Sequence, residues 1–127
     1  ELAANTGWLW DPAKMAEAVS ARESLHSTAL ENGVALLHPR RPQPGILAQA
    51  FLALGRTYQG IPFGDPQGRL TDLFFLICST DDGGHLRTLA RLSRLLADAS
   101  FLDHVRQAEN AEALHAVIVD TETSLFG

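Results

Sequence analysis

A continuous run of large apolar residues, Leu73 to Ile77, constrains the fold of this chain more than any other feature. The run is bulky and bounded by turn-forming residues, which is typical of a strand buried inside a sheet. Soon after it, the sequence Asp-Asp-Gly-Gly at 81–84 opens a segment whose apolar positions, from Leu86 to Leu96, recur about every 3.6 residues. The sequence therefore predicts a buried strand followed by a helix.

The first half of the chain carries a second helix signal and a short strand signal. We expect a helix over residues 12–23, because an Asp-Pro pair at its start suits the N-cap and the first helical position. Val34 to Leu37 is a brief apolar run that ends in His38. Three prolines follow within residues 39–44 and exclude regular structure there.

The remaining segments complete the expected order of elements. Residues 46–54 predict a strand, although their alanines and leucines would also suit a helix. Residues 55–68 contain four glycines and two prolines, which favours loop and turn. Two more helices are expected near 100–107 and 110–121. A helix, then strands, then helices predicts a compact α/β domain.

Size and composition exclude several classes of protein. A chain of 127 residues with 46% hydrophobic and 20% charged residues is typical of one globular domain and not of a disordered segment. The net charge of −5 does not favour direct binding to nucleic acid. The longest strongly apolar run is far too short to cross a membrane, so we expect no membrane insertion and no leader. The single cysteine, Cys78, excludes an internal disulfide, so we expect a cytoplasmic location.

Two of the five histidines stand out by position. His38 follows a strand-like run and precedes a loop, which is where α/β proteins place reactive groups. His85 lies at the start of a helix, where the dipole favours a bound anion and a neutral imidazole. The alternative interpretation is a helix start that happens to contain a histidine, with the glycines serving the turn. His26, His104 and His115 have no feature beyond surface or packing roles.

Other chemistries are less well supported. A metal site with Asp82 lacks the histidine spacing of a metal-binding helix, so we expect no metal. Ser79 and Thr80 lack the flanking glycines of a nucleophile elbow, and no nucleotide-binding phosphate loop is present. Cys78 follows the buried strand and is best interpreted as a small core residue.

Two segments carry a resemblance to a known family. Residues 22–38 (Arg-Glu-Ser-Leu-His-Ser-Thr-Ala-Leu-Glu-Asn-Gly-Val-Ala-Leu-Leu-His) are similar to RE-x-x-x-ST-G-I-x-NG-I-A-I-P-H, the signature of the fructose/mannitol-type enzyme IIA family of the bacterial phosphotransferase system. Residues 60–64, the strand 70–79 and the segment 84–92 resemble its second half. The resemblance covers most of residues 7–119.

The resemblance implies a fold, a site and partners. It implies a mixed sheet flanked by helices, with residues 1–127 forming one domain that lacks the family's N-terminal strand and helix or is cut from a longer protein. His38 would accept the phosphoryl group, His85 would support it and Arg22 would be a cation near the phosphate. The donor would be a phosphocarrier such as HPr and the acceptor a IIB-type or regulated protein. No cofactor would be required.

Departures from the family pattern leave three functions open. Leu37 replaces the usual proline before the reactive histidine, and Pro39 stands where a small residue is common. The first function is phosphoryl transfer through His38 in sugar uptake. The second is a regulatory IIA-like domain, since the run His-Pro-Arg-Arg-Pro at 38–42 resembles a subgroup in which this domain follows a helix-turn-helix segment. The third is a binding module that is never phosphorylated.

Overall fold

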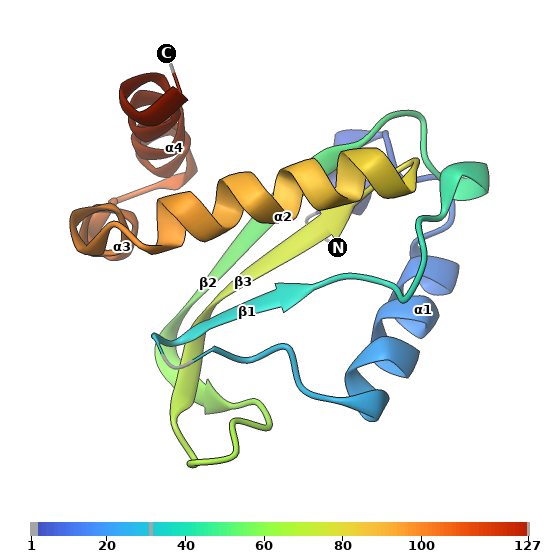
Figure 1. Ribbon diagram of the computed structural model, residues 1–127, viewed down its shortest axis with the longest axis horizontal. Helices are drawn as coiled ribbons and strands as arrows, with labels where there is room; N and C mark the ends of the chain where they lie inside the picture. The colour runs from blue at the N-terminus through green and yellow to red at the C-terminus, as the bar shows by residue number, and fades with distance from the viewer. Residues whose placement is uncertain (1–2, 31, 127) are drawn as a thin grey trace. The chain divides into compact units, whose positions relative to one another are not determined.

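The computed structural model describes residues 3–30 and 32–126. Its elements follow one another as shown in Figure 1. They are a 3₁₀ helix Ala4–Thr6, α1 Pro12–Leu25, β1 Val34–Leu37, a 3₁₀ helix Pro44–Ile46, β2 Phe51–Pro62, β3 Leu70–Cys78, α2 Asp82–Leu96, α3 Ala99–Gln107 and α4 Ala111–Phe126. The chain forms two compact units, and the boundary between Leu86 and Arg87 falls inside α2.

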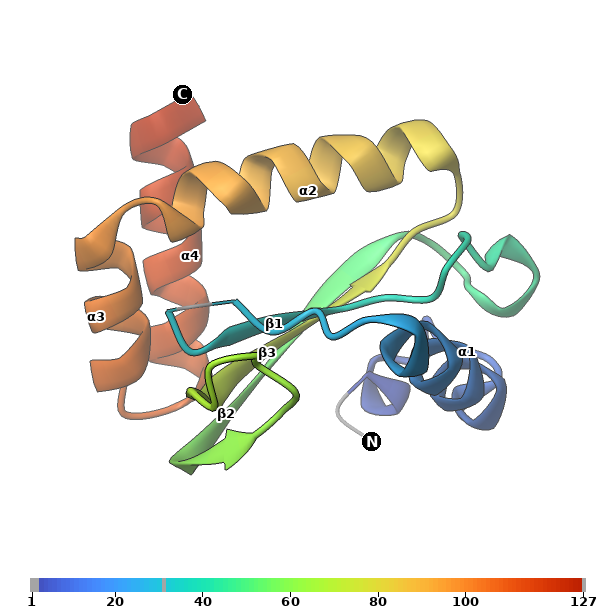
Figure 2. The same cartoon turned by 60° about the horizontal axis from the view of Figure 1, so that its bottom comes forward.

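A three-stranded sheet in the order β1-β3-β2 forms the centre of the first unit. β1 runs parallel to β3, with Leu37 opposite Leu76, and β2 runs antiparallel to β3, with Ala53 opposite the same leucine. Figures 1 and 2 show β3 between its two neighbours. The predicted α/β class with a mixed sheet is therefore confirmed, and the apolar run at 73–77 forms the middle of the central strand.

The prediction for β2 was wrong at both ends. The strand starts at Phe51, after a 3₁₀ helix and a short bend, and continues to Pro62 through residues expected to form a loop. β2 lies at the sheet edge and pairs with β3. The hydrogen bonds of this pairing outweigh the weak strand preference of the glycines and polar residues in β2. The register shifts between Arg56 and Ile61. Within this shift, a Cβ on Gly60 would lie 2.5 Å from the Cβ of Leu70, so the close approach requires glycine.

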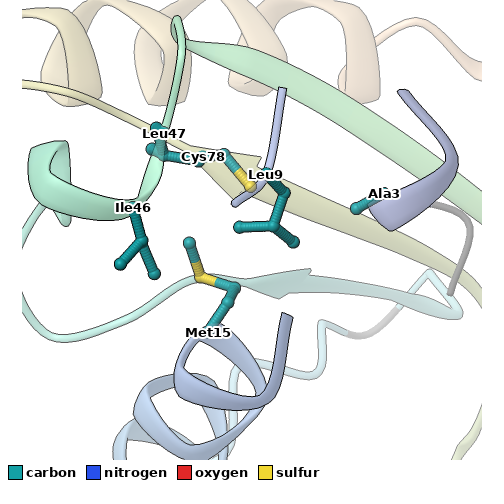
Figure 3. Packing of buried hydrophobic residues seen from close by; sticks show 6 residues of the cluster. All are labelled: Ala3, Leu9, Met15, Ile46, Leu47 and Cys78. Carbon is teal, nitrogen blue, oxygen red and sulfur yellow. The ribbon is translucent and has the colours of Figure 1, made fainter. Parts of the chain in front are cut away.

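Helix α1 and the N-terminal segment cover one face of the sheet. The Asp11 side chain accepts a hydrogen bond from the Lys14 amide at 3.0 Å, which caps the helix as the sequence predicted. Met15 is the buried residue of α1. It belongs to an apolar cluster drawn in Figure 3, whose buried members are Ala3, Leu9, Met15, Ile46, Leu47 and Cys78. Burying a side chain of this size stabilises the fold by roughly 1.5–3 kcal/mol.

The segment before β1 holds that short strand in place on its outer side. The Leu30 amide donates to the Val34 carbonyl at 2.7 Å, and the Leu36 amide donates to the Thr28 carbonyl at 3.4 Å. The turn between these segments contains Gly33 with φ of 81°, a conformation that favours glycine. The side chain of Glu23 accepts hydrogen bonds from both the hydroxyl and the amide of Thr28. These contacts fix the strand that leads to His38.

The second unit contains the rest of α2 with α3 and α4. Its buried residues are Leu92, Leu95, Leu96, Phe101, Leu102 and Val105. Arg91 and Arg94 place their guanidinium groups 4.7 and 4.8 Å from the ring centroid of Phe126. The helices predicted near 100–107 and 110–121 are confirmed, and the last one continues to Phe126. Among the residues described, no helix is long and apolar enough to cross a membrane.

Candidate active site

The site lies where two neighbouring strands, β1 and β3, end. β1 ends at Leu37, so His38 is the first residue beyond the strand. β3 ends at Cys78, and the chain then turns into α2, which begins at Asp82. Because β1 and β3 are parallel, their carboxyl ends lie at the same edge of the sheet, as the two arrowheads in Figure 1 show. His38 and the start of α2 therefore meet.

The rings of His38 and His85 lie next to each other. Their centroids are 5.0 Å apart and their planes are tilted by 48°. The Nδ1 atom of His38 lies 2.8 Å from the carbonyl oxygen of Leu36. Since a carbonyl only accepts hydrogen bonds, this contact places a proton on Nδ1. The neutral ring of His38 therefore has its lone pair on Nε2.

His85 lies in the first turn of α2. The helix is capped by Asp81, whose carboxylate accepts a hydrogen bond from the Gly84 amide at 2.6 Å. The Nδ1 atom of His85 lies 3.2 Å from the hydroxyl oxygen of Ser79. Burial lowers the pKa of His85 below its ordinary value and the neighbouring charge of His38 lowers it further, whereas Asp82 raises it. The lowered pKa favours the neutral form of His85 at pH 7.

Arg22 lies in the last turn of α1. Its Nη1 atom donates to the carbonyl oxygen of His26 at 2.7 Å, just beyond the end of that helix. Within the described residues, the Arg22 side chain makes this one hydrogen bond. It makes none to His38. The structure thus joins His38 with His85 directly, while Arg22 stabilises the end of α1.

The sequence of this chain matches the family described as "Phosphoenolpyruvate-dependent sugar phosphotransferase system, EIIA 2" over residues 1–121. The chain belongs to this EIIA 2 family. A nitrogen regulatory protein of Bradyrhizobium diazoefficiens is 34% identical over 104 residues, which cover 80% of this chain and 66% of that protein. The chain thus spans about two thirds of the length of this relative.

Two further comparisons agree with the family. The fructose-specific EIIABC component of the phosphotransferase system of Bacillus subtilis is 30% identical over 114 residues, 88% of this chain and 18% of that protein. The crystal structure of the nitrogen regulatory protein IIA-Ntr from Neisseria meningitidis matches with a TM-score of 0.70 and 31% identity, covering 80% of this chain and 69% of that one. The resemblance inferred from the two histidine motifs is confirmed.

The remaining histidines of this EIIA domain have other surroundings. His26 lines a hollow of about 580 Å³ together with Asp65 and Arg69. His104 and His115 are exposed on α3 and α4. Across residues 3–30 and 32–126, no group of three or more histidine, cysteine or acidic side chains is arranged to hold a metal ion.

A smaller hollow of about 310 Å³ borders the turn into α2. It is lined by Arg41, Pro42, Pro44, Thr80, Asp81 and Asp82. Arg40 and Arg41 form a short basic pair in the sequence, and Arg41 contributes to this hollow beside two carboxylates. The charges there are mixed, so the hollow has no net preference for an anion.

Sequence reasoning missed two groups of this EIIA domain that touch the histidines. One is the Leu36 carbonyl, which sets the proton position on His38 and which no side-chain pattern could reveal. The other is Ser79, which was considered only as a nucleophile but instead contacts His85. Its place between a buried strand and a helix start was the available signal.

Proposed function

We propose that this EIIA domain accepts a phosphoryl group on Nε2 of His38 from a phosphohistidine carrier protein of the HPr type. The observation that carries the proposal is the hydrogen bond between Nδ1 of His38 and the Leu36 carbonyl. It leaves the nucleophilic lone pair on the other ring nitrogen, which has no hydrogen-bond partner among the described residues. The lowered pKa of His85 favours its neutral form. The neutral ring adds no positive charge beside the His38 ring, which itself becomes positively charged during transfer.

The transfer step balances without a cofactor. The Nε2 lone pair of His38 attacks phosphorus in line, and the P–N bond to the donor histidine breaks as the new P–N bond forms. The donor imidazole leaves with the electron pair of the broken bond. The His38 ring then carries positive charge, and its Nδ1–H remains hydrogen bonded to the Leu36 carbonyl, which stabilises that charge. Such catalysis depends on positioning and on electrostatic stabilisation.

The positive field around the phosphoryl group would come from two sources. The N-terminal end of α2, where His85 lies, carries the positive end of the helix dipole, which the carboxylates of Asp81 and Asp82 partly offset. Arg22 would supply a full charge, in keeping with its place in the signature. Its guanidinium uses one donor on the His26 carbonyl, so other donors of the planar fork are available to phosphoryl oxygens.

The experiment is to measure the intact mass of the purified chain after incubation with phosphoenolpyruvate, enzyme I and HPr. We expect an acid-labile gain of one phosphate that His38→Ala abolishes. The matched control is His115→Ala, which removes an exposed histidine of α4 and should keep the gain. A gain that persists in His38→Ala would reject His38 as acceptor. No gain in a folded wild-type chain would favour the module that binds without phosphorylation.

A regulatory role is the second candidate, because relatives named nitrogen regulatory proteins match this chain at 28–34% identity. In that case the phosphorylation state of His38 would control binding to a regulated protein. Transfer to a fructose-type IIB protein separates the two roles. Rapid loss of phosphate from His38 to IIB supports sugar uptake, whereas a stable phosphorylated chain in its presence supports regulation. For either role we place the domain in the cytoplasm, where it would meet its carrier.

A further inference from the structure

Ser79 is a buried polar residue at the junction between β3 and α2. Only 5% of the surface of Ser79 is exposed to solvent. Its hydroxyl oxygen lies 3.2 Å from Nδ1 of His85, and within the described chain this is its hydrogen-bond partner. A buried hydroxyl that lacks a hydrogen-bond partner destabilises the folded chain. The side chain is therefore tied to the histidine pair.

The hydrogen bond could run in either direction. If Nδ1–H of His85 donated to Ser79, the lone pair of that ring would lie on Nε2. A phosphoryl group on the adjacent His38 ring presents only acceptor oxygens, so that lone pair would repel it. If the Ser79 hydroxyl donates instead, Nε2 of His85 carries the proton and can donate to a phosphoryl oxygen.

The direction of the hydrogen bond between Ser79 and His85 matters because the His85 ring carries only one proton. Burial and the neighbouring His38 both lower the pKa of His85. The ring therefore holds a single proton at neutral pH, and one partner on Nδ1 decides which nitrogen carries it. Asp82 acts in the opposite direction on this pKa but makes no hydrogen bond to the ring in the described structure.

We propose that Ser79 is a positioning residue whose hydroxyl donates to Nδ1 of His85 and thereby holds the His85 proton on Nε2, ready to donate to the phosphoryl group on His38. This inference rests on the proposed function of His38. Ser79 acts through His85 and does not itself touch the phosphoryl group. The two rings would then hold opposite tautomers, with the lone pair on Nε2 of His38 and the proton on Nε2 of His85.

The decisive measurement is the tautomer of His85, read from the ¹⁵N chemical shifts of the unphosphorylated, histidine-labelled chain. We expect the Nε2–H form in the wild type and a shift toward Nδ1–H in Ser79→Ala. Ser79→Thr keeps the hydroxyl and should restore the Nε2–H form. If threonine does not fit and the variant fails to fold, Ser79→Cys replaces it and should give an intermediate population. Ser93→Ala is the matched control, because its hydroxyl bonds the Leu89 carbonyl.

The second measurement is the rate of phosphate uptake by His38 in the same variants. Loss of one hydrogen bond to a charged phosphoryl oxygen should slow uptake about tenfold in Ser79→Ala, and Ser93→Ala should match the wild type. Variants are compared only where their circular dichroism matches that of the wild type. A merely structural role of Ser79 would slow uptake without moving the tautomer.

The two readouts separate the inference from the proposed function. A wild-type His85 in the Nδ1–H form, or a tautomer unchanged in Ser79→Ala, would overturn the role of Ser79 even if His38 is phosphorylated normally. A wild type that takes up no phosphate would overturn the proposed function and with it the role of this proton in transfer. The tautomer shift would then uphold only the contact between Ser79 and His85.

Discussion

The imidazole rings of His38 and His85 lie with their centroids 5.0 Å apart, and each is held through its Nδ1 atom. A backbone carbonyl holds the first ring and the Ser79 hydroxyl holds the second. In the described structure, neither Nε2 atom has a hydrogen-bond partner. The pair therefore offers two unoccupied nitrogens at one edge of the sheet, and their protonation determines what the pair can do.

The phosphoryl group should be attached to Nε2 of His38 and not to Nδ1. The Leu36 carbonyl already occupies Nδ1 and would have to be displaced for the other isomer to form. The measurement is long-range ¹H–¹⁵N correlation on the phosphorylated, ¹⁵N-labelled chain. Phosphorus coupled to Nδ1 would contradict the prediction and show that the ring turns before it reacts.

The pKa of His85 should move in opposite directions in two variants. His38→Ala removes the neighbouring charge that lowers this pKa, so the pKa should rise. Asp82→Asn removes the carboxylate that raises it, so the pKa should fall. The measurement is the shift of the His85 Cε1 proton during a pH titration. An unchanged pKa in both variants would mean that neither neighbouring charge contributes and that burial alone sets the pKa of His85.

Stability should depend on pH through the same histidine. The His85 imidazole binds its second proton less readily in the folded chain than in the unfolded chain, where its pKa has the ordinary value of 6.5. The contribution of neutral His85 is therefore fully present above that pH and is lost as pH falls below it. Urea unfolding at about pH 7.5 and about pH 5.5 should show a smaller decrease for His85→Gln than for the wild type. An equal decrease would contradict the prediction.

Arg22→Ala should slow phosphate uptake by His38 on the order of 10- to 100-fold, the effect of losing a charged hydrogen bond to the phosphoryl group. It should lower the free energy of unfolding by no more than about 1.5 kcal/mol, because the His26 carbonyl that it bonds can turn to water. Stopped-flow transfer from phosphorylated HPr measures the rate. Arg94→Ala removes the cation over Phe126 and should leave the rate unchanged. Equal rates for Arg22→Ala and the wild type would exclude the role.

Cys78 should be unreactive in the folded chain. It is 1% exposed, and burial raises the pKa of its thiol to about 11. A disulfide reagent with a coloured product should react slowly with the native chain and rapidly in guanidinium. The chain has a single cysteine, so the signal belongs to this residue. Rapid reaction under native conditions would show that the end of β3 opens.

Met15→Ala should lower the free energy of unfolding by about 2–5 kcal/mol. The side chain is the buried anchor of α1 within the cluster of Figure 3, and truncation leaves a cavity against Leu9 and Ile46. Urea denaturation followed by circular dichroism measures the change. Lys14→Ala, on the exposed surface of the same helix, should change it by less than about 0.5 kcal/mol. Similar losses in both variants would place the helix outside the cooperative core.

The fold was predictable where one segment alone determines its structure. The run at 73–77 is apolar enough to be a central strand in any context, and the Asp-Pro start of α1 supplies its own cap. The second half of β2 was not predictable. Its glycines and polar side chains are typical of loops, and its strand conformation depends on hydrogen bonds to β3. A pairing partner far away in the sequence leaves no local pattern.

The site was predictable to a similar extent. A histidine after a strand and another at a helix start are visible in the sequence, and the family signature joined them. The geometry around them was not visible, because the Leu36 carbonyl has no side-chain signal and the Ser79 contact depends on the path of the turn. Arg22 matched the signature, yet its position is determined by the end of α1, where it bonds His26.

The parallel pairing of Leu37 with Leu76 also determines where this domain tolerates insertions and deletions. One residue added within β1 would turn His38 to the opposite face of the sheet and separate it from His85. The connection between β2 and β3 is less constrained beyond Gly64, because both strands are aligned by their own hydrogen bonds and the Ser27 hydroxyl contacts only the start of the connection. An engineer could therefore graft a recognition peptide into that hairpin and leave the histidine pair intact.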